Sequence, residues 1–236
     1  MEIRIIKLAS RRLFLMALCL LVLFASGTSC SRAKTSVKKD KILIGFSIAT
    51  ATFIIERWNK DIKIFTGAAR DLGADVLVQL SAGGTKEQIA QINFLLASDI
   101  DVLVVVAHDT DMLSGVVKKA KDAKIPVIAY DRLIMGVPID AYVSFNNKQV
   151  GKLFGKTLLE AVPKGNYVIV NGSVHDNNSF EVNSGLHEEL DPAINRKDVH
   201  VVEELWLDQW SSDEALEKLG KVLERTRDID AISCAN

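Results

Sequence analysis

The feature that most constrains the fold is a regular alternation of β-branched runs and amphipathic stretches from residue 41 onward. The first run, 41–48, reads KILIGFSI and has no polar face, which is typical of a strand covered on both sides. Apolar residues then recur at helical spacing from Trp58 to Leu72, and Gly73 follows as a C-cap would. Strands separated by single helices form right-handed βαβ units, so this order predicts parallel sheets.

The same cycle continues through the rest of the chain. It predicts strands at 75–80, 101–107, 125–130, 141–145, 167–171, 199–205 and 229–235. It predicts helices that begin with a capping box at Thr85 and that cover 112–123, 148–162, 180–190 and 213–225. Because the strands fall into two groups, we expect an α/β protein with two lobes, 41–145 and 146–236, each a parallel sheet with helices on both faces.

The first 29 residues have the order of a secretory signal peptide. Four basic residues precede an apolar run from Leu13 to Ala25, which is short for a membrane span, and small residues follow it. Cys30 comes next and resembles the cysteine of a bacterial lipobox, although Gly27 stands where that motif usually has Leu. We expect residues 30–40 to form a linker after a lipidated Cys30, with simple cleavage near 26–29 as the alternative.

Composition excludes several classes of function. Beyond the first 29 residues, 25 basic and 29 acidic residues leave a net charge of −4, which argues against nucleic acid as a partner. No cysteine or acidic cluster has metal-site spacing, and no nucleophile motif is present, so we expect neither a cofactor nor an enzyme. The segment from Gly151 to Thr157 imitates a phosphate-binding loop, but its apolar residues follow a helical stripe. Cys234 is expected to be a buried strand residue.

Polar and aromatic side chains follow the ends of the predicted strands, where ligands of open parallel sheets bind. Guanidinium, carboxylate and amide groups exchange hydrogen bonds with hydroxyls, and an indole packs on the apolar face of a sugar ring. The pattern therefore favours a sugar site. The candidates lie in Glu56-Arg57-Trp58, Tyr130-Asp131-Arg132, His175-Asp176-Asn177-Asn178 and Trp206-Leu207-Asp208-Gln209-Trp210, and at Asn236.

Several candidates also have a plainer structural interpretation. Trp58 begins the apolar stripe of its helix and is equally suited to core packing. Asp131 and Arg132 are adjacent and suit a loop ion pair. Asp176 has the position of an N-cap residue. Trp210 lies in a polar loop with no helical stripe around it, which favours a functional role.

A resemblance to a known family rests on longer stretches of the chain. These are Glu56-Arg57-Trp58-Asn59-Lys60-Asp61, Ile100–Val105, Ala129-Tyr130-Asp131-Arg132-Leu133-Ile134, Ser144–Gly151, Val162–Tyr167, Asp176-Asn177-Asn178 and Trp206-Leu207-Asp208-Gln209-Trp210. With them, the chain from about residue 41 to 236 resembles the D-xylose-binding proteins of bacterial ABC importers, a branch of the type I periplasmic sugar-binding family.

The resemblance implies that Arg57, Asp131, Arg132, Asp176, Asn178, Trp210 and Asn236 contact the sugar, with Trp58 added by its position. It also implies a protein outside the cytoplasm, in the periplasm or on the outer face of the cell membrane. Such a protein captures D-xylose or a related aldose between two lobes that close at a hinge near residues 145–147. It passes the monosaccharide to a membrane permease and its ATPase.

Two departures from the family pattern bear on function. The segment Ala49-Thr50-Ala51-Thr52 lacks the family's acidic residues, and the sequence stops at Asn236, within what resembles the family's Ala-Asn-Asp turn. The resemblance therefore implies an incomplete second lobe, and we expect poor stability and weak or no sugar binding. The alternatives are an inactive truncated fragment and a sugar sensor that reports to a chemoreceptor or kinase.

Overall fold

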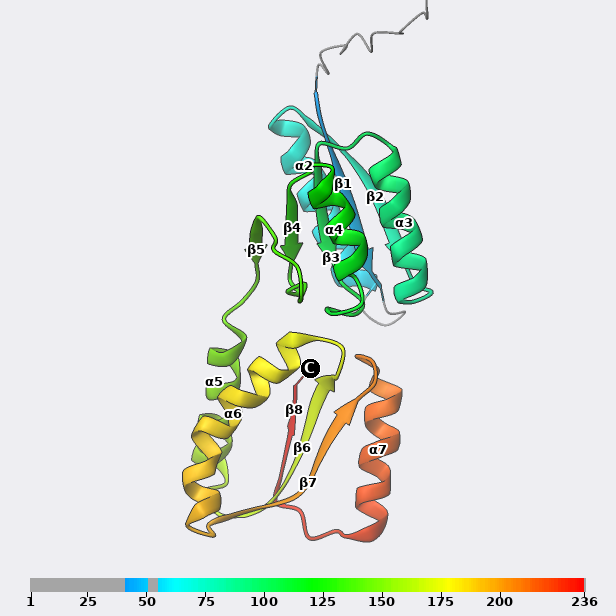
Figure 1. Cartoon of the computed structure of the whole chain (residues 1–236). Helices are drawn as coiled ribbons and strands as arrows, with labels where there is room; N and C mark the ends of the chain where they lie inside the picture. The colour runs from blue at the N-terminus through cyan, green and yellow to red at the C-terminus, as the bar shows by residue number, and fades with distance from the viewer. Residues whose placement is uncertain (1–40, 51–54, 236) are drawn as a thin grey trace, which may run out of the picture. The chain divides into compact units, whose positions relative to one another are not determined.

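A computed structural model describes residues 41–50 and 55–235 (Figure 1). The predicted leader 1–29, the linker 30–40 with Cys30, the loop residues Ala51 and Thr52, and Asn236 lie outside the described residues. Within the described part, no helix has the length and apolar character needed to cross a bilayer.

The first lobe is a parallel sheet of five strands in the order β2-β1-β3-β4-β5. Each of the first three strands is followed along the chain by a helix, as the alternation of patterns predicts, and the fourth strand leads to the fifth without one. The strands are β1 (Ile42–Ala49), β2 (Ala74–Ser81), β3 (Val102–Val106), β4 (Val127–Tyr130) and β5 (Ala141–Val143). The helices are α2 (Ile55–Asp71), α3 (Thr85–Ala97) and α4 (Ser114–Asp122).

The second lobe contains a parallel sheet of three described strands in the order β7-β6-β8. The strands are β6 (Gly165–Ser173), β7 (Val199–Leu207) and β8 (Ala231–Cys234). The helices are α5 (Asn147–Ala161), α6 (Asn177–Asn195) and α7 (Ser212–Arg225). Apolar contacts place α5 and α6 on one face of this sheet and α7 on the other. The predicted α/β architecture of parallel sheets with helices on both faces is confirmed.

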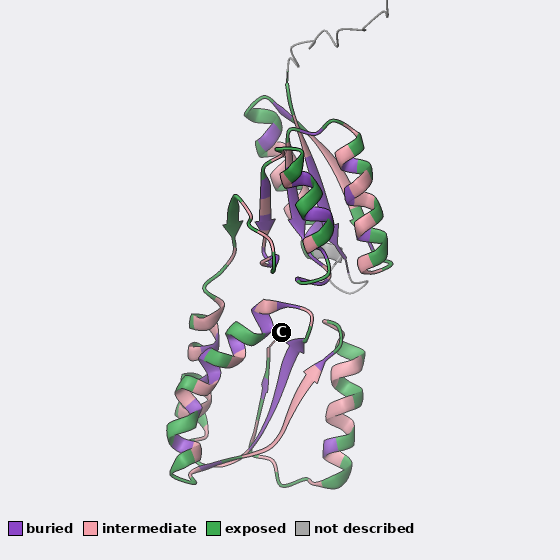
Figure 2. Cartoon of the chain, viewed as in Figure 1, coloured by how far each residue is buried: buried purple, intermediate pink, exposed green. Residues whose placement is uncertain are grey.

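Both faces of the first sheet are buried, and Figure 2 shows β1 and β3 largely in the colour of buried residues. Leu103 and Val105 point to the side of α3 and α4, whereas Val104 points to the side of α2. This arrangement explains why the β1 and β3 sequences have no polar face. Burial of these strands fixes their carboxyl ends, from which the candidate site is built.

Helices α5 and α6 cross with their backbones in contact, and glycines make this approach possible. A Cβ atom at Gly151 would lie 1.9 Å from the carbonyl oxygen of Val182, and one at Gly185 would lie 1.9 Å from that of Lys148. Gly155 faces α6 in the same way, since a Cβ there would lie 2.9 Å from the Leu186 carbonyl oxygen. The segment that imitates a phosphate-binding loop is therefore the packing face of a helix.

Two local predictions are wrong. Helix α3 begins at Thr85, with Gly84 in the N-cap position and no side-chain cap, so Thr85 does not open a capping box. Glu87 instead reaches back to accept from the backbone N–H of Gly83. Cys234 is exposed, because it lies on the α7 side of β8 while α7 packs over β7.

Candidate functional site

A cavity of about 270 Å³ brings together the described candidates from both lobes. Its lining includes all seven sequence candidates within the described residues, and Ala235, the neighbour of Asn236, reaches it as well. The lining residues are Arg57, Trp58, Asp131, Arg132, Phe145, Asn147, Val150, Asp176, Asn178, Val182, Trp210 and Ala235. They come from the start of α2, the end of β4, the segment around α5, the start of α6, the loop after β7 and the end of β8.

Arg57 and Asp131 form an ion pair at one side of this cavity. Arg57 lies near the N-terminus of α2, and Asp131 directly follows β4, two elements that share the same edge of the sheet. The Arg57 guanidinium also lies 4.5 Å from the ring centroid of Trp58 and 3.8 Å from a carboxylate oxygen of Asp61. A planar guanidinium held by an aromatic face and carboxylates is fixed in orientation.

The backbone of Asp131 is held in a left-handed conformation, with φ of 65°. This region is uncommon for residues other than glycine, and Asp is one of the types that tolerate it. The Asp131 N–H donates to the carbonyl oxygen of Val143 at 2.7 Å, and its own carbonyl oxygen accepts from the hydroxyl of Ser144 at 2.7 Å. Both partners lie on β5 or just after it, so the chain at the end of the first lobe holds Asp131 in place.

Asn178 in the first turn of α6 connects the second lobe to Asp131. Its amide nitrogen donates to the Asp131 carbonyl oxygen at 3.1 Å and to the Asp131 carboxylate at 3.2 Å. Its amide oxygen accepts from Asn147 at 2.9 Å and from the Tyr142 hydroxyl at 3.4 Å. Burial raises the pKa of Tyr142, which keeps its hydroxyl protonated as a donor.

Arg132 and Asp176 form a second ion pair, which also joins the two lobes. The Arg132 Nε lies 2.9 Å from a carboxylate oxygen of Asp176, and their side chains are 11% and 2% exposed. The same carboxylate oxygen accepts from the Trp210 indole N–H at 2.9 Å. The other oxygen of Asp176 accepts from the Asn178 N–H, so Asp176 caps α6 as its sequence position predicts. Asp131 and Arg132 do not pair with each other; each pairs across to a residue on another segment.

Trp58 lines the cavity and is also part of the core. It is 1% exposed and packs with Phe46, Ile48 and Val106. Its indole N–H is buried and has no hydrogen-bond partner among the residues that the structure describes. Trp58 therefore packs in the core and lines the cavity at the same time, because its ring lies on the α2 side of the sheet and borders the cavity.

Besides Ala235, four lining residues were not predicted from the sequence. Phe145 and Asn147 lie in the segment singled out as a hinge, so a search of that segment for ring and amide groups would have found them. Val150 and Val182 stand next to the glycine crossing of α5 and α6 and give no sequence signal of their own. Apolar residues from α5 and α6 thus complete one wall of the cavity.

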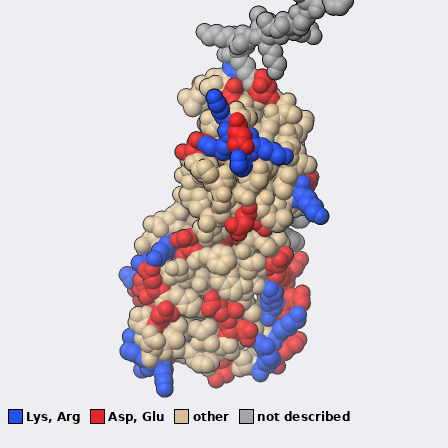
Figure 3. All heavy atoms as spheres, viewed as in Figure 1, with Lys and Arg blue, Asp and Glu red and all other residues tan. Residues whose placement is uncertain are grey.

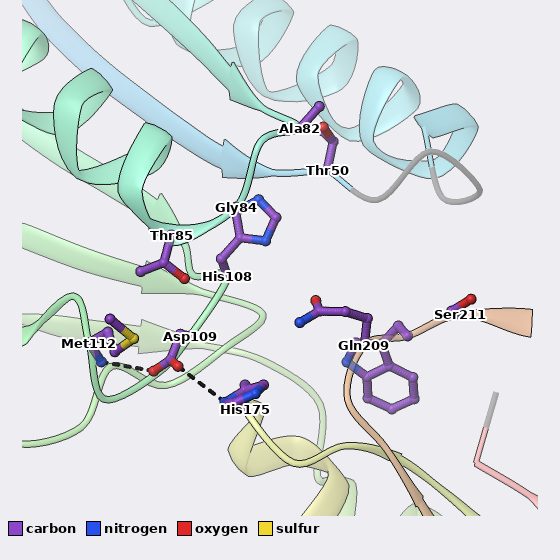
Figure 4. A pocket seen from close by; sticks show the side chains of 11 residues that line it. Thr50, Ala82, Gly84, Thr85, His108, Asp109, Met112, His175, Gln209 and Ser211 are labelled. Atoms are coloured by element: carbon purple, nitrogen blue, oxygen red, sulfur yellow. Dashed lines mark hydrogen bonds and ion pairs between the residues drawn. The ribbon is translucent and has the colours of Figure 1, made fainter. Parts of the chain in front are cut away.

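A second cavity of about 440 Å³ lies at the ends of β1, β2 and β3 (Figure 4). It borders the first cavity at Trp210, which lines both. Figure 4 shows His108 and Asp109 from the first lobe and His175, Gln209 and Ser211 from the second around this space. Burial lowers the pKa of His108, whose ring nitrogen Nε2 lies 2.8 Å from the Ser81 carbonyl oxygen.

The remaining titratable groups do not gather into a metal site: among the described residues, no group of three or more His, Cys, Asp or Glu side chains has that arrangement. His187 is partly buried between Asp191 at 2.9 Å and Glu204 at 3.1 Å. Burial opposes the charged imidazolium, but the hydrogen bond to Asp191 and the charge of Glu204 together raise the pKa of His187. On the face in Figure 3, Lys and Arg are interspersed with Asp and Glu.

Comparison with known proteins gives consistent results. The D-xylose-binding periplasmic proteins of Haemophilus influenzae and Escherichia coli are 38% and 36% identical to the chain over 86% and 91% of its length. The chain spans only 60% and 65% of these curated relatives. A solute-binding protein of an ABC transporter from Clostridium phytofermentans, solved with bound β-D-glucose, superposes with a TM-score of 0.74 and 28% identity. That match covers 82% of this chain and 64% of the solved one.

A family model described as a periplasmic binding protein domain matches residues 45–236. This range includes every described residue of the cavity and both sheets apart from the first residues of β1. The order of strands and helices, the cavity between the lobes and the matched range agree with one another. The chain belongs to the periplasmic binding protein domain family.

Proposed function

We propose that the protein is the sugar-binding component of a bacterial ABC-type importer and captures a monosaccharide, D-xylose or a related aldose, between its two lobes. The observation that carries the proposal is the convergence of seven candidate residues on one cavity. They come from separate segments of both lobes, at strand ends that the sequence pattern predicts, and the family resemblance names these residues within those segments. The relatives named for D-xylose are similar over most of this chain.

The chemistry of the cavity matches an uncharged ligand with many hydroxyls. Its four ionisable groups are two guanidiniums, Arg57 and Arg132, and two carboxylates, Asp131 and Asp176, so the lining has no excess charge. Each charge has an opposite partner within the cavity wall, which suits hydroxyls that both donate and accept hydrogen bonds. The rings of Trp58, Trp210 and Phe145 supply apolar surface for the C–H face of a sugar.

In this function the protein makes and breaks no bonds. The two lobes close over the sugar by rotation at the segment 145–147, and Arg132, Asp176 and Asn178 join the lobes in the closed form. The proposal places the protein outside the cytoplasm, where it delivers the sugar to a permease with its ATPase. The leader, the lipidated Cys30 and the lobe boundaries 41–145 and 146–236 remain predictions of the sequence.

Fluorescence titration of the purified protein with D-xylose tests this proposal. Two of the three tryptophans, Trp58 and Trp210, line the cavity, so sugar binding should change their emission in a saturable way. D-Ribose, L-arabinose and D-glucose measure selectivity, and sorbitol serves as an open-chain control. Asp131→Ala should abolish the response, because it removes the carboxylate that Arg57 pairs with at the cavity and leaves only the more distant Asp61.

The opposite result has a clear meaning. If no aldose produces a saturable change in a folded sample, or if Asp131→Ala binds as well as the parent protein, the proposed site is wrong.

A further inference from the structure

The second cavity is lined by polar groups that already have protein partners. The Thr50 hydroxyl donates to the Ser81 carbonyl oxygen at 3.1 Å, and the His108 ring contacts the same oxygen. Asp109 accepts from two backbone N–H groups. A ligand at these three residues would have to compete with bonds that the protein already makes. What stands out at its border is a contact between the lobes, centred on His175.

His175 lies between two carboxylates that come from different lobes. Its ring nitrogen Nδ1 is 3.2 Å from an oxygen of Asp109, which follows β3 in the first lobe. Its Nε2 is 3.2 Å from an oxygen of Asp208, which follows β7 in the second lobe. Figure 4 shows the first of these contacts across the cavity. A neutral imidazole has a single N–H, so only the charged imidazolium donates to both carboxylates at once.

Hydrogen bonds from the backbone hold the Asp109 carboxylate in place for this contact. It is 8% exposed, and its other oxygen accepts from the N–H groups of Asp111 and Met112 at 2.9 and 2.8 Å. The neighbouring Thr110 donates its backbone N–H to the carbonyl oxygen of His175 at 3.1 Å. The backbone and side chain of His175 therefore both connect to the same loop of the first lobe.

The other charged groups around His175 are already paired. Asp176, the next residue, is bound to Arg132. Glu214 of α7 accepts from the N–H groups of Asp208 and Gln209 and pairs with Lys218. The neighbouring His108 ring is bound to the Ser81 carbonyl oxygen. Asp109 and Asp208 are thus the two acidic groups that directly contact the imidazole.

We propose that His175, Asp109 and Asp208 form a proton-dependent clasp that holds the two lobes together when the imidazole is charged. The clasp lies apart from the candidate sugar cavity, whose lining includes none of these three residues. With the lobes closed, a charged imidazole donates to both Asp109 and Asp208, whereas a neutral imidazole donates to only one of them. Protonation of the ring therefore favours closure of the lobes, and loss of the proton weakens it.

The effect on sugar binding is modest. His175 is 39% exposed and Asp208 is 71% exposed, so solvent screens the contact. Exposed ion pairs contribute about 0.2–1 kcal/mol, and we therefore expect affinity for sugar to fall about two- to fivefold between pH 5.5 and pH 8.0. This part of the inference rests on the proposed function, whereas the clasp itself requires no sugar.

Small-angle X-ray scattering of the sugar-free protein at pH 5.5 and 8.0 tests the clasp directly. We expect a larger radius of gyration at pH 8.0 for the parent protein. His175→Gln should show the pH 8.0 value at both pH values, because glutamine keeps a donor but carries no charge. His200→Gln, at an exposed histidine on β7, is the matched control and should follow the parent protein. D-Xylose titrations at the same two pH values give the effect on affinity.

Asp208→Asn provides a second variant at an exposed position, in case His175→Gln does not fold. It should reduce the pH response in scattering. The clasp is overturned if pH does not change the radius of gyration of the parent protein. It is also overturned if His175→Gln and Asp208→Asn respond to pH as the parent protein does. A pH response in scattering without sugar binding supports the clasp and rejects the proposed function. Sugar binding without any pH response in scattering supports the proposed function and rejects the clasp.

Discussion

Replacement of Asp176 by Asn tests how the cavity wall joins the two lobes. The substitution keeps the shape of the side chain but removes its charge. If the amide oxygen continues to accept from the Asn178 N–H, the new NH₂ group points toward the Arg132 Nε–H and the Trp210 indole N–H, which are both donors. The Asn NH₂ group, the Arg132 Nε–H and the Trp210 indole N–H would then be three donors that face one another with no acceptor between them.

The magnitude follows from burial. Removing one partner of a buried ion pair costs about 3–5 kcal/mol. Arg132 retains a hydrogen bond to the Ala107 carbonyl oxygen at 2.8 Å, which lowers the expected cost to about 2–3 kcal/mol. Because Arg132 and Asp176 come from different lobes, this cost falls on the closed form. We therefore expect sugar affinity to fall about 30- to 150-fold.

Calorimetric or fluorescence titration measures this change, with thermal unfolding as a check on folding. Asp122→Asn is a matched control, since its ion pair with Lys118 is exposed on α4 and far from the cavity in sequence and fold. The reasoning is refuted if Asp176→Asn binds within twofold of the parent protein, or if Asp122→Asn loses affinity to the same extent.

Three further predictions concern packing and pH. Gly151→Ala should lower the free energy of unfolding by about 3 kcal/mol or more in urea titrations, because its Cβ meets the α6 backbone, whereas Gly67→Ala, with open space, should not. Gly172→Ala should weaken sugar binding more than it lowers stability, since its Cβ would lie 2.2 Å from Trp210 Cη2; equal losses would contradict this. His187→Gln should cost about 1–2 kcal/mol at pH 5.5 and less at pH 8.5. Its raised pKa means that the stabilisation is present below the unfolded value and is lost as pH rises through the folded one, so a pH-independent difference in urea titrations would count against it.

The sequence predicted the elements because periodic burial determines them. The apolar runs of β1 and β3 and the stripe of α2 required two-sided and one-sided burial, and the structure provides both. Local endings were less predictable. Thr85 fits a capping box by spacing, but the tight turn at Gly84, with φ of 84°, starts α3 one residue earlier than that motif requires.

The candidate site shows the same division. Strand-end positions and residue chemistry identified the segments that line the cavity, because parallel strands bring their carboxyl ends to one edge, and the family resemblance selected residues within them. Spacing did not reveal their partners. Asp131 and Arg132 are adjacent, yet the positive φ of Asp131 sends the two side chains to different partners. The burial of His187 depends on Glu204, which is distant in sequence, so no local pattern indicates it.

The glycine crossing of α5 and α6 has a consequence for how ligand recognition is transmitted. Helix α5 starts at Asn147, in the segment proposed as the hinge, and α6 starts next to Asp176 and Asn178, so the two helices connect the proposed pivot directly to residues that face the cavity. Backbone contact at Gly151 and Gly185 leaves little room for either helix to slide. The pair should therefore act as a single stiff lever, in which any displacement of Asn178 turns the pivot. Substitutions that change which sugar is preferred would then also change how readily the molecule shuts, so selectivity and motion cannot be tuned independently.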